Sequence, residues 1–280
     1  MALRPNSPVA ADYSPDSSRM VRRTCLEIAT RLGDFKNELC VVGGMVPSLI
    51  VAPSDLPEGE TPHVGTMDLD LGFSVAVLDG QRYEEIARRL ANAGFEPDKN
   101  QSGNPTAQRW KSTCGVTVDF LIPPSRRDDE GGRLRNLDEN FAAFIVPGLD
   151  LAFKDSVLIT IADELPRGGR ATREIRVCGP GSFVLLKGLA FGNRASPKDA
   201  YDLYYVLRHH HLGARSIGKS IGGFGEHSVI AEAIETLRRD FTEPDLLGPT
   251  HVANFFGGPD EDVQADTVGF VREFLSGSGR

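Results

Sequence analysis

The chain has 280 residues, 40% of them hydrophobic, and a formal net charge of -8 at pH 7. This length and apolar content allow a substantial core in one or two domains. No apolar run reaches the roughly 20 residues of a transmembrane helix and the N-terminus lacks the apolar part of a signal peptide, so we expect a cytoplasmic protein without a membrane contact. The acidic balance argues against a basic surface over the whole molecule, so a nucleic-acid site would be local, with arginine-rich runs at 19–23, 126–135 and 167–176 as candidates. The alternative is that these arginines are solvated surface charges balanced by nearby acids. The cysteines lie far apart without a C-x-x-C pair, which predicts buried, reduced thiols rather than zinc ligands or disulfides: Cys25, Cys40, Cys114 and Cys178.

The first part of the chain alternates helices with short strands. Residues 1–16 are rich in Pro, Ser, Ala and Asp without apolar periodicity, which predicts a disordered lead-in. Apolar residues at helical spacing then predict a helix over 17–35. A short buried strand at 39–42 runs into Gly43-Gly44, a short helix over 45–51 and a loop, and a second strand is expected at 66–73.

The rest of the chain changes from strands to helices. A helix from Tyr83 to Gly94 is followed by a predicted hairpin of strands 108–111 and 116–121, a polar connection over 123–140, and strands near 143–146, 157–161 and 174–178. Helical patterns then cover 182–192, 197–210, 229–241 and 263–275, with a glycine-rich break at 213–225. This order predicts an α+β fold with a disordered segment 1–16, a catalytic domain 17–178 and a helical C-terminal domain 179–280.

Three aspartates interrupt otherwise apolar strands. Asp68 and Asp70 are two residues apart, so both carboxylates point to one face of their strand, roughly 6.6 Å apart along it. Asp119 lies in the later hairpin and can join them on the same sheet. Carboxylates that converge repel each other unless a cation compensates, and oxygen ligands favour Mg²⁺ or Mn²⁺. The alternative is a pair of acids on the solvated face of an edge strand.

Gly43 and Gly44 join a strand to a helix. Such a junction directs backbone N–H groups and the positive end of the helix dipole toward a phosphate, and glycine permits close approach. The alternative is a tight turn that needs a positive φ.

This order of elements resembles the nucleotidyltransferase fold of the DNA polymerase β superfamily over residues 39–121. The carrying features are Gly43-Gly44, the strand Thr66-x-Asp68-x-Asp70 and the hairpin with Asp119. The resemblance implies a core of mixed sheet flanked by helices. A second motif is similar to the AbiEii-type toxin nucleotidyltransferases of bacterial toxin–antitoxin systems and extends the resemblance to residues 39–210: Lys187-Gly188-Leu189-Ala190-Phe191-Gly192-Asn193-Arg194, then Pro197-Lys198-Asp199-Ala200-Tyr201-Asp202-Leu203.

The resemblance implies a two-metal transfer of a nucleoside monophosphate from an NTP to a hydroxyl group. Two Mg²⁺ or Mn²⁺ ions would be held by Asp68, Asp70 and Asp119, and Asp119 is the candidate to receive the hydroxyl proton. The implied acceptor is RNA, such as a tRNA 3′ end, and the implied partner is a cognate antitoxin protein. The implied nucleotide-binding residues are Gly43, Gly44, Thr66 and Lys187, with Asp199 and Asp202 fixing a cationic side chain at the site.

Other interpretations stay open at this point. The acceptor can be a small molecule such as an antibiotic, or the protein itself, and the chain can also be an inactive nucleotide-binding module. Ser196-x-x-Asp199 is also a capping box, and Lys187 can be a surface lysine on an amphipathic helix. Relatives often carry an arginine shortly before the threonine, where this chain has His63, Val64 and Gly65.

Two further patterns are set aside. Residues 213–220 match the P-loop pattern G-x-x-x-x-G-K-S, but the expected elements provide neither a strand before them nor a long helix after them. His209, His210 and His211 are adjacent on a helix and point in different directions, which suits a helix C-terminus better than a metal site.

Overall fold

The computed structural model describes residues 8–74, 80–100 and 102–280. By its internal contacts the chain divides into two compact units. The sheet unit comprises residues 15–46 and 66–178, and the helical unit comprises the remaining described residues, 8–14, 47–65 and 179–280. Each unit is described by itself.

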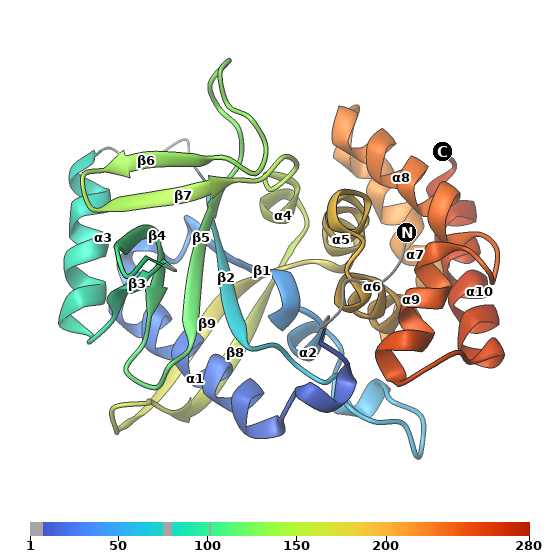
Figure 1. The fold of residues 1–280 in the computed structure, drawn as a ribbon, viewed down its shortest axis with the longest axis horizontal. Coiled ribbons are helices and arrows are strands. Elements are labelled where there is room, and N and C mark those ends of the chain that lie inside the picture. Colours follow the sequence, from blue (N-terminus) through green and yellow to red (C-terminus); the bar gives the residue numbers. More distant parts are fainter. Residues whose placement is uncertain (1–7, 75–79, 101) are drawn as a thin grey trace. The chain divides into compact units, whose positions relative to one another are not determined.

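Within the described residues, the strands of the sheet unit form one mixed sheet, as Figure 1 shows. The strand order is β3-β4-β5-β2-β1-β9-β8, and β7 pairs with both β5 and β6. The pairs β2–β5, β1–β9 and β5–β7 are parallel and the other pairs are antiparallel. The strands are β1 Leu39–Val42, β2 Asp68–Phe73, β3 Glu96–Lys99, β4 Pro105–Lys111, β5 Thr117–Ile122, β6 Leu134–Asp138, β7 Phe141–Ile145, β8 Ser156–Glu164 and β9 Arg170–Cys178.

Helices flank this sheet, so the α+β prediction with a mixed sheet is confirmed. Helix α1 (Pro15–Arg31) packs on β9 and β8, and α3 (Gly80–Asn92) packs on β6 and β7. The core of the sheet unit contains the rings of Phe73, Phe120 and Phe141, whose centroids lie 4.8–6.1 Å apart. The short α4 (Leu151–Lys154) and the 3-10 turns η2 (Gly33–Phe35) and η3 (Gly43–Met45) complete the unit.

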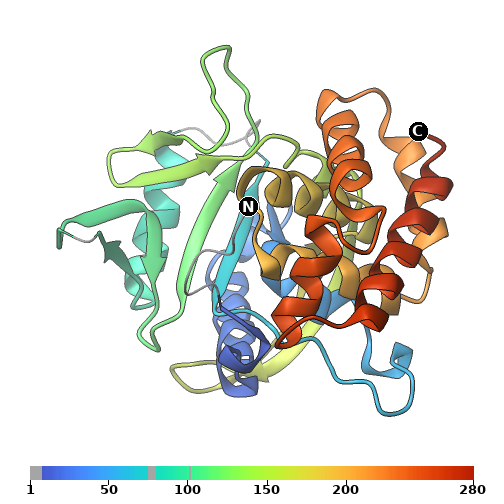
Figure 2. The ribbon, with the colours of Figure 1, turned by 45° about the vertical axis from the view of Figure 1, so that its right-hand side comes forward.

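The helical unit is built from α5 to α10, which Figure 2 shows from yellow to red. Proline begins both α5 and α6, where its missing N–H costs no helical hydrogen bond. Aromatic rings fill the core, with Tyr201 stacked on Phe255 and Phe191 against Phe241. The helices are α5 Pro180–Arg194, α6 Pro197–His209, α7 Ala214–Ser220, α8 Ser228–Phe241, α9 Leu247–Phe256 and α10 Glu261–Ser278, with the 3-10 turn η6 Ile221–Phe224.

Two segments outside the C-terminal region also belong to the helical unit. Residues 47–65 contain α2 (Pro47–Ile50) and the 3-10 turn η4 (Pro53–Asp55), and residues 10–12 form the 3-10 turn η1 (Ala10–Asp12). The ring of Tyr13 lies 5.8 Å from that of Phe255, so this part of the expected lead-in packs on the helices. The first seven residues of the expected lead-in lie outside the described residues.

Several expectations from local pattern were wrong. The expected break at 213–225 contains α7, in which Gly218 allows close packing, because a Cβ there would lie 2.1 Å from the carbonyl oxygen of Phe274 in α10. The expected connection 123–140 contains β6. Its sequence, LRNLD, lacks the alternation of a strand, and the segment is extended because it pairs with β7. Cys114 is exposed, whereas Cys25, Cys40 and Cys178 are buried as predicted. None of the helices in the described part of the chain is long and apolar enough to cross a membrane.

Candidate functional site

The predicted aspartates lie together on two paired strands of the sheet unit. In the parallel pair β2–β5, Asp70 is directly opposite Asp119, and Asp68 is opposite Thr117. Directly opposed residues share a face of the sheet, and Asp68 shares that face because it is two residues from Asp70. Asp119 is buried, whereas Asp68 and Asp70 are half-buried. The sheet therefore presents a partly accessible row of carboxylates.

An arginine that the sequence analysis missed extends this row. Arg109 on β4 is directly opposite Asp119. Its Nε donates to Oδ1 of Asp119 over 2.7 Å and its Nη2 donates to Oδ2 over 2.5 Å. This bidentate pair is the strongest geometry for an arginine and a carboxylate, and hydrogen bonding by Asp119 raises the pKa of the Arg109 guanidinium. The sequence contains the information needed to predict this pair. A hairpin whose turn is centred on Cys114 places residues 109 and 119 opposite each other.

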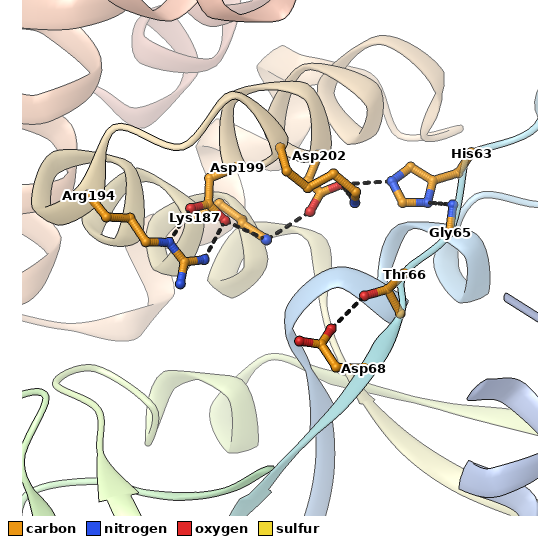
Figure 3. Close-up of polar contacts among 9 residues, drawn as sticks. His63, Gly65, Thr66, Asp68, Lys187, Arg194, Asp199 and Asp202 are labelled. Atoms are coloured by element: carbon orange, nitrogen blue, oxygen red, sulfur yellow. Dashed lines mark hydrogen bonds and ion pairs between the residues drawn. The ribbon is translucent and has the colours of Figure 1, made fainter. Parts of the chain in front are cut away.

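Thr66 and Gly43 shape the surroundings of the other two aspartates. The Thr66 hydroxyl donates to Oδ1 of Asp68 over 2.8 Å, which holds that carboxylate in one rotamer (Figure 3). Gly43 has a φ of 70° and follows β1, where Val42 pairs with Asp70. A Cβ on Gly43 would lie 2.0 Å from Oδ2 of Asp70, so any other residue at position 43 would displace Asp70 or the turn. Gly44 lies in the same 3-10 turn.

Asp68 and Asp70 offer the hard oxygen donors that Mg²⁺ and Mn²⁺ prefer. Among the residues that the structure describes, however, no group of three or more His, Cys, Asp or Glu side chains is arranged to hold a metal ion. At Asp119, both carboxylate oxygens are bound by Arg109. The donor set thus fits a cation at Asp68 and Asp70, and recruitment of Asp119 requires Arg109 to release it.

The second motif forms a buried charge cluster in the helical unit (Figure 3). Lys187 Nζ lies 2.8 Å from Oδ1 of Asp199 and 2.8 Å from Oδ2 of Asp202. Arg194 binds Asp199 through Nε and Nη2, at 2.6 and 2.8 Å, and Lys198 forms an ion pair with Asp202. Lys187 is therefore not a surface lysine, and both oxygens of Asp199 serve Lys187 and Arg194 rather than a helix cap.

Mutual charge compensation keeps this cluster ionised. Burial alone would lower the pKa of Lys187, but Asp199 and Asp202 together raise it. Burial alone would raise the pKa of Asp202, but Lys187 and Lys198 hold it well below its usual range. Two carboxylates thus face three cations, Lys187, Lys198 and Arg194, which leaves one positive charge in excess.

His63 is a member of this cluster that sequence reasoning noted only as a departure from an arginine. Its Nδ1 accepts a hydrogen bond from the Gly65 N–H over 3.0 Å, so the proton resides on Nε2, which donates to Oδ1 of Asp202 over 2.8 Å. The ring stacks on Tyr201. Burial and the charge of Lys198 lower the pKa of His63 to about 4, so the imidazole is neutral at pH 7.

The remaining motifs do not form sites. The segment that matches a P-loop lies in α7, which follows helix α6, and Lys219 is exposed. Arginines of the runs at 19–23 and 126–135 form ion pairs with acidic residues of the same chain. Arg23 pairs with Asp163, and Arg133 pairs with Glu130. His210 stacks on His211.

A scan of protein-family models, a search of curated proteins and a search of solved structures each returned no match to this chain. Its function must therefore be argued from the geometry of the two clusters.

Proposed function

We propose that this protein is a divalent-metal-dependent nucleotidyltransferase with a polymerase β-like core. One observation carries the proposal: Asp70 is opposite Asp119 on paired strands, with Asp68 on the same face and the Gly43 turn against Asp70. Carboxylates on neighbouring strands beside a glycine turn would suit nucleotidyl transfer, because this reaction brings a triphosphate and metal ions together.

Each residue of the carboxylate row has a role in this proposal. Asp68 and Asp70 would hold Mg²⁺ or Mn²⁺, and the Thr66 hydroxyl orients Asp68 by donating to its Oδ1. The bound metal would offset charge on the triphosphate and on the leaving pyrophosphate. Both carboxylate oxygens of Asp119 accept hydrogen bonds from Arg109, so Asp119 could accept the hydroxyl proton only after Arg109 has moved away.

The helical unit would supply binding to anions. Its cluster carries an excess positive charge, and the Arg194 side chain is 60% exposed whereas that of Lys187 is 8% exposed. We therefore propose Arg194, as well as Lys187, as an anion-binding residue of the helical unit, with Asp199 and Asp202 holding both cations in place. The NTP phosphates or an acceptor phosphate would both suit this site.

The acceptor in our proposal is RNA, such as a tRNA 3′ end, with an antitoxin protein as the partner that restrains the activity. This part rests on the resemblance of the second motif to AbiEii-type toxins. A small-molecule acceptor is the competing proposal. An RNA acceptor would bind with steep salt dependence, because binding releases counterions from the phosphates, whereas a small acceptor would not.

The deciding experiment is Mg²⁺-dependent incorporation of each labelled NTP into total RNA. Asp68→Asn and Asp70→Asn should each reduce transfer by about a hundredfold or more, since several kcal/mol of charge stabilisation are lost. Asp128→Asn, at an exposed loop position, is the matched control and should retain full activity. Circular dichroism confirms the fold of each variant. Full activity of Asp70→Asn would refute the proposal, and NTP binding without transfer by the wild type would favour an inactive nucleotide-binding module.

A further inference from the structure

Among the strands that the structure describes, β8 lies at an edge of the sheet in the sheet unit. Within the described residues its only strand partner is β9, with which it forms nine consecutive pairs from Ser156↔Cys178 to Glu164↔Arg170 without a register shift. Figure 1 shows this long hairpin, in yellow-green to yellow. An edge strand exposes a row of backbone N–H and C=O groups that can pair with another strand.

The other edges of the sheet carry features that prevent such pairing. β3 has the sequence EPDK, with a proline, three charges and a register shift between Pro97 and Lys99. β6 is five residues long, carries Arg135 and Asp138, and also has a register shift. Charges, proline and bulges are the usual protection of an edge against association.

β8 has none of this protection over most of its length. Residues 156–162, SVLITIA, contain no charge, proline or glycine. Val157 and Leu158 are 37% and 61% exposed. The acids Asp163 and Glu164 stand only at its end, where Arg23 binds both. A long, regular edge without charges over most of its length is a feature of an association surface.

We propose that β8 is a homodimerisation surface, on which the β8 strands of two copies pair antiparallel about a two-fold axis. Centred on Thr160, this pairing uses all nine residues of β8. It places Ile159 of each copy opposite Ile161 of the other, and Leu158 of each copy opposite Ala162 of the other. Such cross-strand apolar pairs stabilise a sheet.

The charges at the ends of β8 are compatible with this register and disfavour a shift toward Asp155. In the pairing centred on Thr160, Asp163 and Glu164 of each copy face Val157 and Ser156 of the other, so no like charges are opposed. A centre one residue earlier would place Asp155 opposite Asp163, which is destabilising. The second copy therefore offers a strand that pairs with all nine residues of β8 without opposed like charges.

Two exposed threonines on one face of the same hairpin provide matched variants. Thr160 is at the proposed axis, whereas Thr172 lies on β9, one strand away from the edge and opposite Ala162. Thr160→Lys would set two lysines against each other at the axis, and Thr172→Lys adds the same charge away from it. Sedimentation velocity across a wide concentration range should show a dimer for the wild type and for Thr172→Lys, and a shift to monomer for Thr160→Lys.

Crosslinking tests the register directly. In a Cys114→Ser background, which removes the exposed native thiol, Thr160→Cys should form a covalent dimer with a short bismaleimide, because opposed side chains lie about 5 Å apart. Thr172→Cys should not, because three strand spacings separate the two β9 strands by about 15 Å. A wild type that stays monomeric throughout, or a dimer that Thr160→Lys leaves intact, overturns the proposal. Neither result depends on nucleotidyl transfer.

Discussion

Gly43 lies against the carboxylate of Asp70, where a Cβ on residue 43 would be 2.0 Å from Oδ2. The turn after β1 therefore packs tightly against the middle of β2 at the row of carboxylates. Any side chain at position 43 must push Asp70 away or move the turn, so this glycine links the backbone of the strand–turn–helix junction to the proposed metal site.

Gly43→Ala should destabilise the fold and abolish transfer. The positive φ costs about 1–2 kcal/mol, and the clash with Asp70 adds about 1–3 kcal/mol. Gly115→Ala is the control, because Gly115 also has a positive φ, 87°, but has no atom within 4 Å of the added Cβ. Urea unfolding should show the larger loss for Gly43→Ala. Equal losses for the two variants would mean that contact with Asp70 is unimportant.

Arg109→Gln should lower stability and strengthen metal binding. Removing the guanidinium leaves Asp119 without its bidentate partner, at a cost of about 1–3 kcal/mol, less than for a fully buried pair because the Arg109 side chain is 42% exposed. With Asp119 released, Mn²⁺ should stabilise Arg109→Gln more than the wild type, which thermal unfolding with and without Mn²⁺ measures. Arg133→Gln, which breaks an exposed pair with Glu130, should change neither quantity. If Mn²⁺ stabilises both proteins equally, Arg109 does not compete with the metal.

Lys187→Met should cost about 3–5 kcal/mol, because it leaves the buried Asp199 and Asp202 short of a cation. Lys219→Ala, at an exposed position of α7, should stay within about 0.5 kcal/mol of the wild type and keep NTP-dependent transfer. Urea unfolding and the labelled-NTP assay measure both effects. Loss of NTP binding in Lys219→Ala, beside an active Lys187→Met, would instead favour a P-loop enzyme.

His63 should make the helical unit less stable in acid. Its pKa is lowered from 6.5 to about 4 in the folded state, so below pH 6.5 the unfolded chain binds a proton that the folded chain does not. This contribution is fully present above pH 6.5 and is lost as the pH falls toward 4, by about 3 kcal/mol in total.

His63→Gln tests this dependence, since glutamine is neutral and can still donate to Asp202. The variant should lack this part of the acid destabilisation when unfolding is measured between pH 7 and about 4. His211→Gln, at an exposed position, is the control. A profile of His63→Gln that follows the wild type at every pH would show that His63 does not titrate on unfolding.

Local pattern was sufficient for much of the sheet unit. Alternation in 66–73 places Asp68 and Asp70 on one strand face, and the observed β2 has these residues in that arrangement. Strand β1, the turn at Gly43 and the hairpin that carries Asp119 were also predicted, because each depends on residues close in sequence. Segments whose structure depends on distant partners were missed, as β6 and α7 illustrate.

The partners of the candidate residues were decided only by tertiary structure. The sequence predicted Asp119 as a metal ligand. The register of β4 and β5 places Arg109 opposite Asp119, and Arg109 donates to both of its oxygens. Lys187, Asp199 and Asp202 were predicted from their motif, whereas the neutral His63 reaches Asp202 from 139 positions away. Periodicity records which face a side chain occupies, since that follows from the local backbone. Which charge it meets there depends on long-range packing and desolvation, which no local pattern contains.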